Sequence, residues 1–244
     1  MPLNGGILIV GSLLWDERRE GWRRSRLDME SAESVTAPIR YGRQSETRGN
    51  TYTIVFSRGC DTGKATVVRC RNAASSPDDV ISEAEHLWAA EQNAAVSRKV
   101  SANWGCVTLL CNPKRNIPQT FLTGWANRVA QIQNYGNMAQ PIGEGRLVSD
   151  GGLLQIAWPR RVADGSAVPL DFLLATATRP TLTGEPLAYP AVEMIANAWN
   201  ADAGNHVEYF WKNIDNGICT FQDDEIRALL RARGAQAPSA FRTT

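Results

Sequence analysis

Short apolar runs predict the strands of this chain. Ile7 to Val10 is uniformly apolar and stops at Gly11, which is typical of a buried strand followed by a turn. Six further runs have the β-branched and aromatic content of strands: residues 35–41, 51–56, 64–70, 104–110, 153–158 and 171–177. We therefore expect about six to seven strands.

Periodic and capping signals predict the helices. Ser76 is a suitable N-cap before Pro77, and the helix that follows is expected to run to about Ala95. Helical spacing predicts further helices over residues 121–132, 190–199 and 205–212. A last helix is expected to open at the capping-box pattern of residues 220–223 and to end near Gly234, and residues 135–145 to form a loop.

The order of these elements, strands first and helices last, predicts an α+β fold. No shift in composition divides the chain. We expect one domain over residues 1–234, with a helical extension from about residue 189 and a loose tail over residues 235–244.

Composition and charge exclude several classes. Hydrophobic residues make up 43% of the chain and charged residues 21%, so a core can form. The formal net charge of +1 argues against a nucleic-acid partner. No apolar run approaches the roughly 20 residues of a spanning helix, so no membrane association is expected. The arginines between Asp16 and Arg26 alternate with acidic residues and predict a solvated face.

The cysteines and histidines predict neither a disulfide framework nor a metal site. The chain has five cysteines and two histidines, and no pair of cysteines has the C-x-x-C spacing. An odd count without a signal sequence favours free thiols in a reducing cytoplasm. We expect a cytoplasmic protein without a metal or other cofactor.

Glu91 is the first candidate for chemistry. It lies on the apolar stripe of the helix that begins at Pro77, four residues after Leu87 and three after Trp88. Burial of a carboxylate raises its pKa, which suits a group that takes up and returns a proton. Two structural interpretations stay open from the stripe alone: a frayed helix end, or an ion pair with an arginine at the edge of the core.

The segment Gly11-Ser12-Leu13-Leu14 is the second candidate. A strand that stops at a glycine exposes successive backbone N–H groups, which can bind a carboxylate or a developing oxyanion. An ordinary turn is the alternative. The fifth residue after this strand is Trp15, and a later segment contains Arg40-Tyr41-Gly42-Arg43, followed by Arg48-Gly49.

This order of motifs resembles the γ-glutamylcyclotransferase superfamily, and most of all its ChaC-type, glutathione-degrading branch. The resemblance covers roughly residues 7–111. It implies a mixed, partly closed β-barrel with flanking helices, and an enzyme, a lyase or acyltransferase, that releases 5-oxoproline from a γ-glutamyl amine or peptide. It also implies that Glu91 is the general acid/base and that the backbone of Gly11, Ser12 and Leu13 binds the γ-glutamyl group.

Two more residues complete the predicted substrate site. Arg48 belongs to the Arg-Gly segment, and Tyr209 lies in the helical C-terminal part, from which it can reach a pocket. The chain departs from the family pattern at Val10, where an aromatic residue is usual, and at Trp88. A non-catalytic binding or interaction module on the same fold is therefore the alternative. The leaving group and a homodimeric state are left open.

Overall fold

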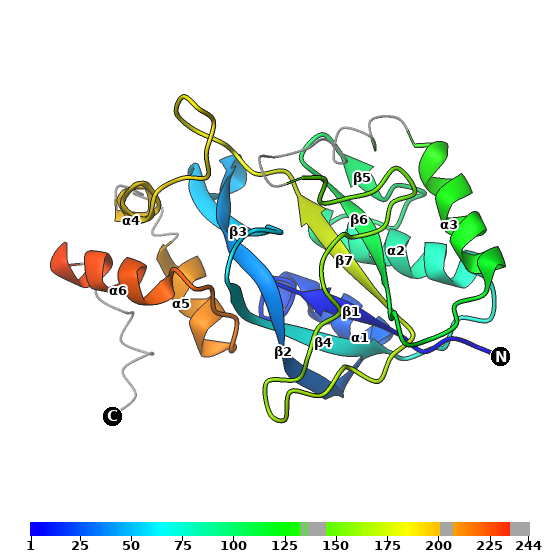
Figure 1. Ribbon diagram of the computed structural model, residues 1–244. Coiled ribbons are helices and arrows are strands. Elements are labelled where there is room, and N and C mark those ends of the chain that lie inside the picture. Colours follow the sequence, from blue (N-terminus) through cyan, green and yellow to red (C-terminus); the bar gives the residue numbers. More distant parts are fainter. Residues whose placement is uncertain (133–134, 136–144, 201–206, 235–244) are drawn as a thin grey trace.

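One seven-stranded mixed sheet organises the chain in the computed structural model, which describes residues 1–132, 135, 145–200 and 207–234 (Figure 1). The strand order is β3-β2-β4-β1-β7-β6-β5. β1 pairs in parallel with β7, and every other neighbouring pair is antiparallel. The strands are β1 (Gly5–Ile9), β2 (Leu27–Ser45), β3 (Thr51–Phe56), β4 (Thr62–Cys70), β5 (Ser101–Ala102), β6 (Gly105–Cys111) and β7 (Phe172–Thr178).

The sheet is open, with β3 and β5 at its two edges. The predicted α+β class and the number of strands are confirmed, but the partly closed barrel is not, because the hydrogen-bonded ladder does not return to its first strand. β3 nevertheless contacts β7 without pairing to it. The long strand β2 carries a register shift between Tyr41 and Arg43, and such bulges bend a strand and redirect its side chains.

Six α-helices and two short 3₁₀ turns lie around this sheet in the described part of the chain. The 3₁₀ turns are η1 (Glu17–Arg19) and η2 (Glu46–Arg48). The helices are α1 (Glu20–Arg26), α2 (Pro77–Gln92), α3 (Gln119–Ala130), α4 (Val192–Asn200), α5 (Val207–Asp215) and α6 (Asp223–Ala232). In Figure 1, α4, α5 and α6 gather at one end of the molecule, beside β2 and β3, while α2 and α3 pack together at the other. None of the helices in the described ranges is long and apolar enough to cross a membrane.

The capping signals at residues 76 and 77 place the start of α2 correctly. The Ser76 hydroxyl accepts a hydrogen bond from the backbone N–H of Asp79, and the Asp79 carboxylate accepts one from the N–H of Ser76. This reciprocal cap satisfies N–H groups that have no partner within the helix. The helix ends at Gln92, where Asn93 adopts the left-handed conformation, and not at Ala95.

Two local predictions are wrong. Residues 153–158 form no strand, because Leu153 and Leu154 make only single bridges to Leu109 and Val148 before the chain turns away. Residues 16–26 form η1 and α1, and this segment is not a solvated face, because Arg19 and Arg23 are buried. The loop predicted over 135–145, the first residues of the helix predicted over 205–212 and the tail predicted over 235–244 lie largely or wholly outside the described residues.

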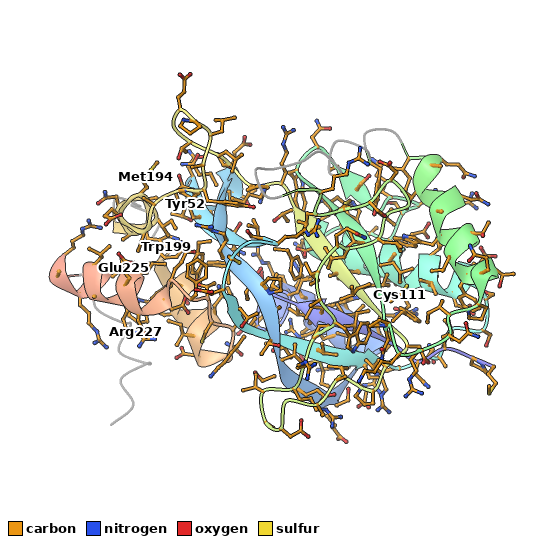
Figure 2. The ribbon with its side chains drawn as sticks, viewed as in Figure 1. Tyr52, Cys111, Met194, Trp199, Glu225 and Arg227 are labelled. Atoms are coloured by element: carbon orange, nitrogen blue, oxygen red, sulfur yellow. The ribbon has the colours of Figure 1, made fainter. Side chains whose placement is uncertain are left out.

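The C-terminal helices join the sheet through an aromatic cluster. Trp199 of α4 packs edge-on against Tyr41 of β2, with ring centroids 4.8 Å apart, and lies 5.1 Å from the ring of Phe210 in α5. Figure 2 shows Trp199 within this end of the molecule. Burial of aromatic rings is among the largest contributions that single side chains make to a core. The cluster therefore fixes α5 beside β2 and β3.

The pairing of β1 with β7 determines where a site can form. Parallel strands end at the same edge of a sheet, so the turn after Ile9 lies beside the end of β7, at Thr176 and Thr178. The last turn of α2 packs over β6 and β7. Glu91, in that last turn, is thereby placed close to the turn that follows β1.

Candidate active site

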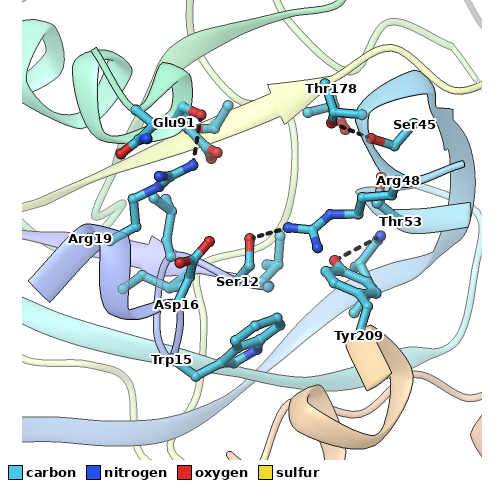
Figure 3. Close-up of a pocket in the computed structure, with 18 of the residues that line it drawn as sticks. Ser12, Trp15, Asp16, Arg19, Ser45, Arg48, Thr53, Glu91, Thr178 and Tyr209 are labelled. Atoms are coloured by element: carbon cyan, nitrogen blue, oxygen red, sulfur yellow. Dashed lines mark hydrogen bonds between the residues drawn. The ribbon is translucent and has the colours of Figure 1, made fainter. Parts of the chain in front are cut away.

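A cavity of about 900 Å³ opens at this edge of the sheet (Figure 3). Its walls come from the turn after β1, from η1, from β2 and η2, from β3, from the ends of α2 and β7, and from α5. This volume is within the range of small-molecule sites. All six residues predicted for the site line the cavity: Gly11, Ser12, Leu13, Arg48, Glu91 and Tyr209.

Glu91 enters the cavity from the last turn of α2. Leu87 and Trp88 on the same helix face are buried, and Glu91 itself is half-buried. Burial raises the pKa of the Glu91 carboxyl above its ordinary value, whereas the Thr176 hydroxyl and the guanidiniums of Arg19, Arg43 and Arg48 act to lower it. Desolvation is the larger influence, so the pKa of Glu91 moves toward neutral pH.

A neighbouring glutamate of α2 has a structural role that Glu91 lacks. The Glu83 carboxylate is buried and forms an ion pair with Arg26, whose Nε also donates a hydrogen bond to Glu83 Oε2 at 3.2 Å. No ion pair within 4.0 Å joins the Glu91 carboxylate to any residue in the described ranges. The ion pair that was one interpretation of Glu91 is therefore not formed there, whereas Glu83 and Glu85 of the same helix are paired with Arg26 and Arg128.

The turn after β1 presents three backbone N–H groups. Leu14 N–H donates to the carbonyl of Gly11 at 3.1 Å and Asp16 N–H to that of Ser12 at 2.8 Å, which closes the turn. Within the part of the chain that the structure describes, no acceptor takes the N–H groups of Gly11, Ser12 or Leu13. Successive unpaired N–H groups at a cavity wall suit a carboxylate or an oxyanion.

Arg48 and Tyr209 stand beside this turn. Arg48 Nη2 donates a hydrogen bond to the Ser12 hydroxyl at 3.1 Å, and the Arg48 guanidinium lies 4.7 Å from the centre of the Tyr209 ring. The Tyr209 hydroxyl accepts a long hydrogen bond, 3.4 Å, from the backbone N–H of Ile54. Burial raises the pKa of Tyr209, so its phenol is neutral at physiological pH.

The C-terminal extension forms one wall of the cavity. Trp15 Nε1 donates a hydrogen bond to Asn213 Oδ1 at 2.9 Å, and the Trp15 ring lies 5.9 Å from that of Tyr209. Lys212 reaches over the Trp15 ring and is paired with Glu208 at 2.8 Å. These contacts tie α5 to the segment that follows the Gly11 turn, so the extension completes the site.

Two arginines of the cavity were missed as site residues. Arg19 comes from η1 and is only 8% exposed, and Arg43 follows the bulge of β2. Their signals were present in the sequence. Arg19, Arg23 and Arg26 are spaced as one helix face, and Arg43 stands next to Gly42 in the segment that carries the family resemblance. The acidic residues between the arginines made a solvated face the simpler interpretation.

Asp16 is an acidic side chain of the cavity wall that is buried. Arg18 donates hydrogen bonds to both Asp16 oxygens, at 3.0 and 2.7 Å, and the pair also forms a salt bridge. Chiefly through these hydrogen bonds, Arg18 lowers the pKa of Asp16 to about 2. Asp16 therefore stays ionised at neutral pH, and Glu91 is the better proton carrier.

The arrangement combines a carboxyl with a raised pKa, successive N–H groups and, besides the Asp16–Arg18 pair, three guanidiniums around one cavity. In the described ranges, no group of three or more His, Cys, Asp or Glu residues is placed to hold a metal ion. No protein-family model matches this chain, and comparisons with curated proteins and with solved structures give no significant match. The chemistry of the site is thus inferred from its own residues.

Proposed function

We propose that this protein is a γ-glutamylcyclotransferase-like enzyme that releases 5-oxoproline from a γ-glutamyl compound, with Glu91 as general acid/base. The observation that carries the proposal is the placement of the Glu91 carboxyl, with its raised pKa, in the same cavity as the free N–H groups of Gly11, Ser12 and Leu13. The order of sequence motifs supports the same function. A partly closed barrel of the γ-glutamylcyclotransferase type is part of this proposal, with the contact between β3 and β7 as its support.

The reaction needs one proton to move twice. The α-amine of the γ-glutamyl group attacks its own γ-carbonyl carbon, a new C–N bond closes the five-membered ring, and the original amide C–N bond breaks. The attacking nitrogen gives a proton to the Glu91 carboxylate, and the protonated carboxyl then gives it to the departing nitrogen. No net proton or electron is consumed, and a single carboxyl with a raised pKa serves both steps.

The remaining residues would bind and orient the substrate. The N–H groups of Gly11 to Leu13 would hold the γ-glutamyl group, including the oxygen that becomes negative during attack. Arg48, held by Ser12 and Tyr209, would bind the α-carboxylate. Because the attack is intramolecular, a bound conformation that folds the amine onto the carbonyl supplies much of the rate.

The direct test is release of 5-oxoproline from a panel of γ-glutamyl amines, γ-glutamyl amino acids and glutathione. We expect turnover of at least one compound and its loss in Glu91→Gln, with the fold retained. Glu20→Gln is the control, because it removes the same charge at an exposed position of α1 outside the cavity. Unchanged turnover in Glu91→Gln would remove Glu91 from the mechanism.

Binding without turnover is the second candidate. It is favoured by the three guanidiniums near Glu91, which stabilise its ionised form and so oppose the proton uptake that catalysis requires. In that case calorimetry would detect binding of a γ-glutamyl compound while no product forms with any member of the panel.

A further inference from the structure

The cavity contains more positive charge than a bound γ-glutamyl group can neutralise. Asp16 is paired with Arg18, and Glu208 with Lys212, so these four charges balance within the wall. Arg19, Arg43 and Arg48 remain, against Glu91 and the exposed Glu17, which leaves one positive charge in excess. A γ-glutamyl group has one negative carboxylate and one positive ammonium group. Its binding therefore leaves the excess positive charge of the cavity unchanged.

Arg19 shows this excess most clearly. Its side chain is 8% exposed, and only Nη2 has a partner, the backbone carbonyl of Glu91 at 3.3 Å. Its Nε and Nη1 are buried and donate to no acceptor among the residues that the structure describes. These two nitrogens are closed to a ligand as well, so Arg19 acts on the cavity through its charge and not through a further hydrogen bond.

Arg43 is more exposed than Arg19. Its guanidinium lies 4.7 Å from the centre of the Trp104 ring, and Trp104 in turn stacks on Trp88 at 4.9 Å. Stacking covers one face of the guanidinium and holds its plane, while the N–H groups at its edge stay available. The Arg43 backbone carbonyl accepts a hydrogen bond from the Thr53 hydroxyl at 3.2 Å, but no residue in the described ranges forms a hydrogen bond or ion pair with the guanidinium.

Arg19 and Arg43 both lie near enough to Glu91 for its charge to act on their guanidiniums. Arg48 is already engaged with Ser12 and Tyr209, at the turn that would hold the γ-glutamyl group. Figure 3 shows Arg19 and Arg48 entering the cavity from opposite sides, with the Arg19 guanidinium directed toward Glu91. The departing nitrogen must also lie at Glu91, so the leaving part of the substrate extends on that side.

We propose that Arg43, reinforced by the buried charge of Arg19, is a specificity-determining residue that binds an acidic group on the leaving part of the substrate. The inference rests on the proposed function and narrows it. The substrate is a γ-glutamyl amino acid or peptide with a carboxylate beyond the scissile bond, and a γ-glutamyl amine without that carboxylate is a poor ligand. The 900 Å³ cavity has room for such an extension.

A matched pair of ligands tests this. γ-Glutamylglycine and γ-glutamylethylamide share the γ-glutamyl group and differ by a carboxylate in place of a methyl group. Affinities are measured by calorimetry in the Glu91→Gln background, which prevents or slows turnover, and kcat/KM for both is measured with the unaltered protein. We expect γ-glutamylglycine to be preferred by on the order of tenfold, as for one charge-assisted hydrogen bond.

Three variants separate the role of Arg43 from a general charge effect. Arg43→Met should bring the preference close to unity by weakening γ-glutamylglycine, and Arg43→Lys should retain part of it. Arg24→Met removes the same charge from an exposed position of α1 outside the cavity and should leave the preference unchanged. Arg19→Met is informative only together with a denaturation curve, because Arg19 is buried.

The outcomes for the two proposals can be told apart. Equal affinity for the two ligands, or a preference that survives Arg43→Met, overturns the acidic subsite and leaves the proposed reaction standing. A preference that depends on Arg43 without any 5-oxoproline supports the subsite and overturns the reaction. Failure of both ligands to bind overturns both proposals.

Discussion

The Tyr209 hydroxyl occupies the space directly in front of Gly11: a β-carbon at Gly11 would lie 2.8 Å from that oxygen and 3.8 Å from ring carbon Cζ. The first distance is too short for any stable contact, and the second is ordinary packing. Tyr209 is held in this place by Trp15, Arg48 and the N–H of Ile54. The turn that would bind the substrate and the helix of the C-terminal extension are therefore fitted to each other at this position.

A first prediction follows from this fit. Gly11→Ala should displace Tyr209 or the turn and lower kcat/KM, or the affinity for a γ-glutamyl ligand, by roughly tenfold or more, because small displacements of a site cost this much. Tyr209→Phe removes the obstructing oxygen, so the double variant should recover much of the loss. Kinetics and ligand titration of the two single variants and the double variant measure the coupling. Strictly additive effects would show that Gly11 and Tyr209 do not interact in this way.

Much of the site was predictable because its parts are local. The apolar run before Gly11, the Ser76 cap and the stripe that contains Glu91 each depend on residues within two or three turns of one another. The parallel pairing of β1 with β7 joins segments more than 150 residues apart, and nothing within either segment specifies the other. The position of the site could therefore be expected only through the family resemblance.

What the sequence could not reveal is the role of charged residues whose partners are distant. Arg26 pairs with Glu83, and Arg19 reaches the backbone of Glu91, in both cases across more than 50 residues. A segment rich in arginine and glutamate looks solvated when considered alone, because burial of charge is favourable only with such partners. The strand expected at residues 153–158 failed for a related reason, since only two of its residues form bridges and only Leu153 bridges a residue of a strand.

The second prediction concerns the pH dependence of turnover. Burial raises the pKa of Glu91 above the ordinary 4.5, and the ionised form is the one that accepts the proton of the attacking amine. The rate should therefore fall as the pH decreases through this raised pKa. Glu91→Gln should abolish this acid limb together with most of the activity, because glutamine does not titrate.

Arg43 provides the third prediction, which tests the origin of that limb. The Arg43 guanidinium acts to lower the pKa of Glu91, so Arg43→Met should raise this pKa and move the acid limb to higher pH. Arg24→Met is the control and should leave the limb in place. The measurement is kcat and kcat/KM as a function of pH for the three proteins. A limb that stays fixed, or moves to lower pH, in Arg43→Met would separate the limb from Glu91.

The fourth prediction concerns the contribution of Glu83, another glutamate of α2, to stability. Breaking a buried ion pair by removing one partner leaves the second charge without compensation, which typically costs about 3–5 kcal/mol. Glu83 is 6% exposed, so Glu83→Gln should lower the free energy of unfolding by about 3 kcal/mol. Urea denaturation measures this loss. Glu20→Gln breaks the exposed pair with Arg24 and should change stability by less than about 1 kcal/mol.

The Arg26 partner permits a sharper test of the same pair. Glu83→Leu combined with Arg26→Met replaces both charges by apolar groups, which is often close to neutral in buried sites. The double variant should therefore be more stable than the sum of the two single losses predicts. Additive losses would mean that Glu83 and Arg26 contribute independently and not as a pair.

Asp223, at the start of α6, provides the last prediction. Its carboxyl is 4% exposed, with Oδ1 accepting a hydrogen bond of 2.6 Å from the Thr220 hydroxyl and Oδ2 without a partner in the described ranges. Burial raises the pKa of Asp223 from 3.8 to about 6. The protonated form is thus favoured by folding, and its contribution to stability is fully present below about pH 4 and is lost as the pH rises through 6.

Asp223→Asn should remove this dependence, since asparagine resembles the protonated form and does not titrate. The two proteins should have similar stability near pH 4, and the variant should be more stable above pH 7 by up to about 3 kcal/mol. Denaturation curves at both pH values measure the difference, and Asp224→Asn, at an exposed neighbouring carboxyl, is the control. A stability difference between Asp223→Asn and the unaltered protein that stays constant with pH would show that Asp223 does not titrate in this range. The expected pH-dependent gain would instead show that the buried Asp223 carboxyl titrates in this range and that its ionised form destabilises the fold.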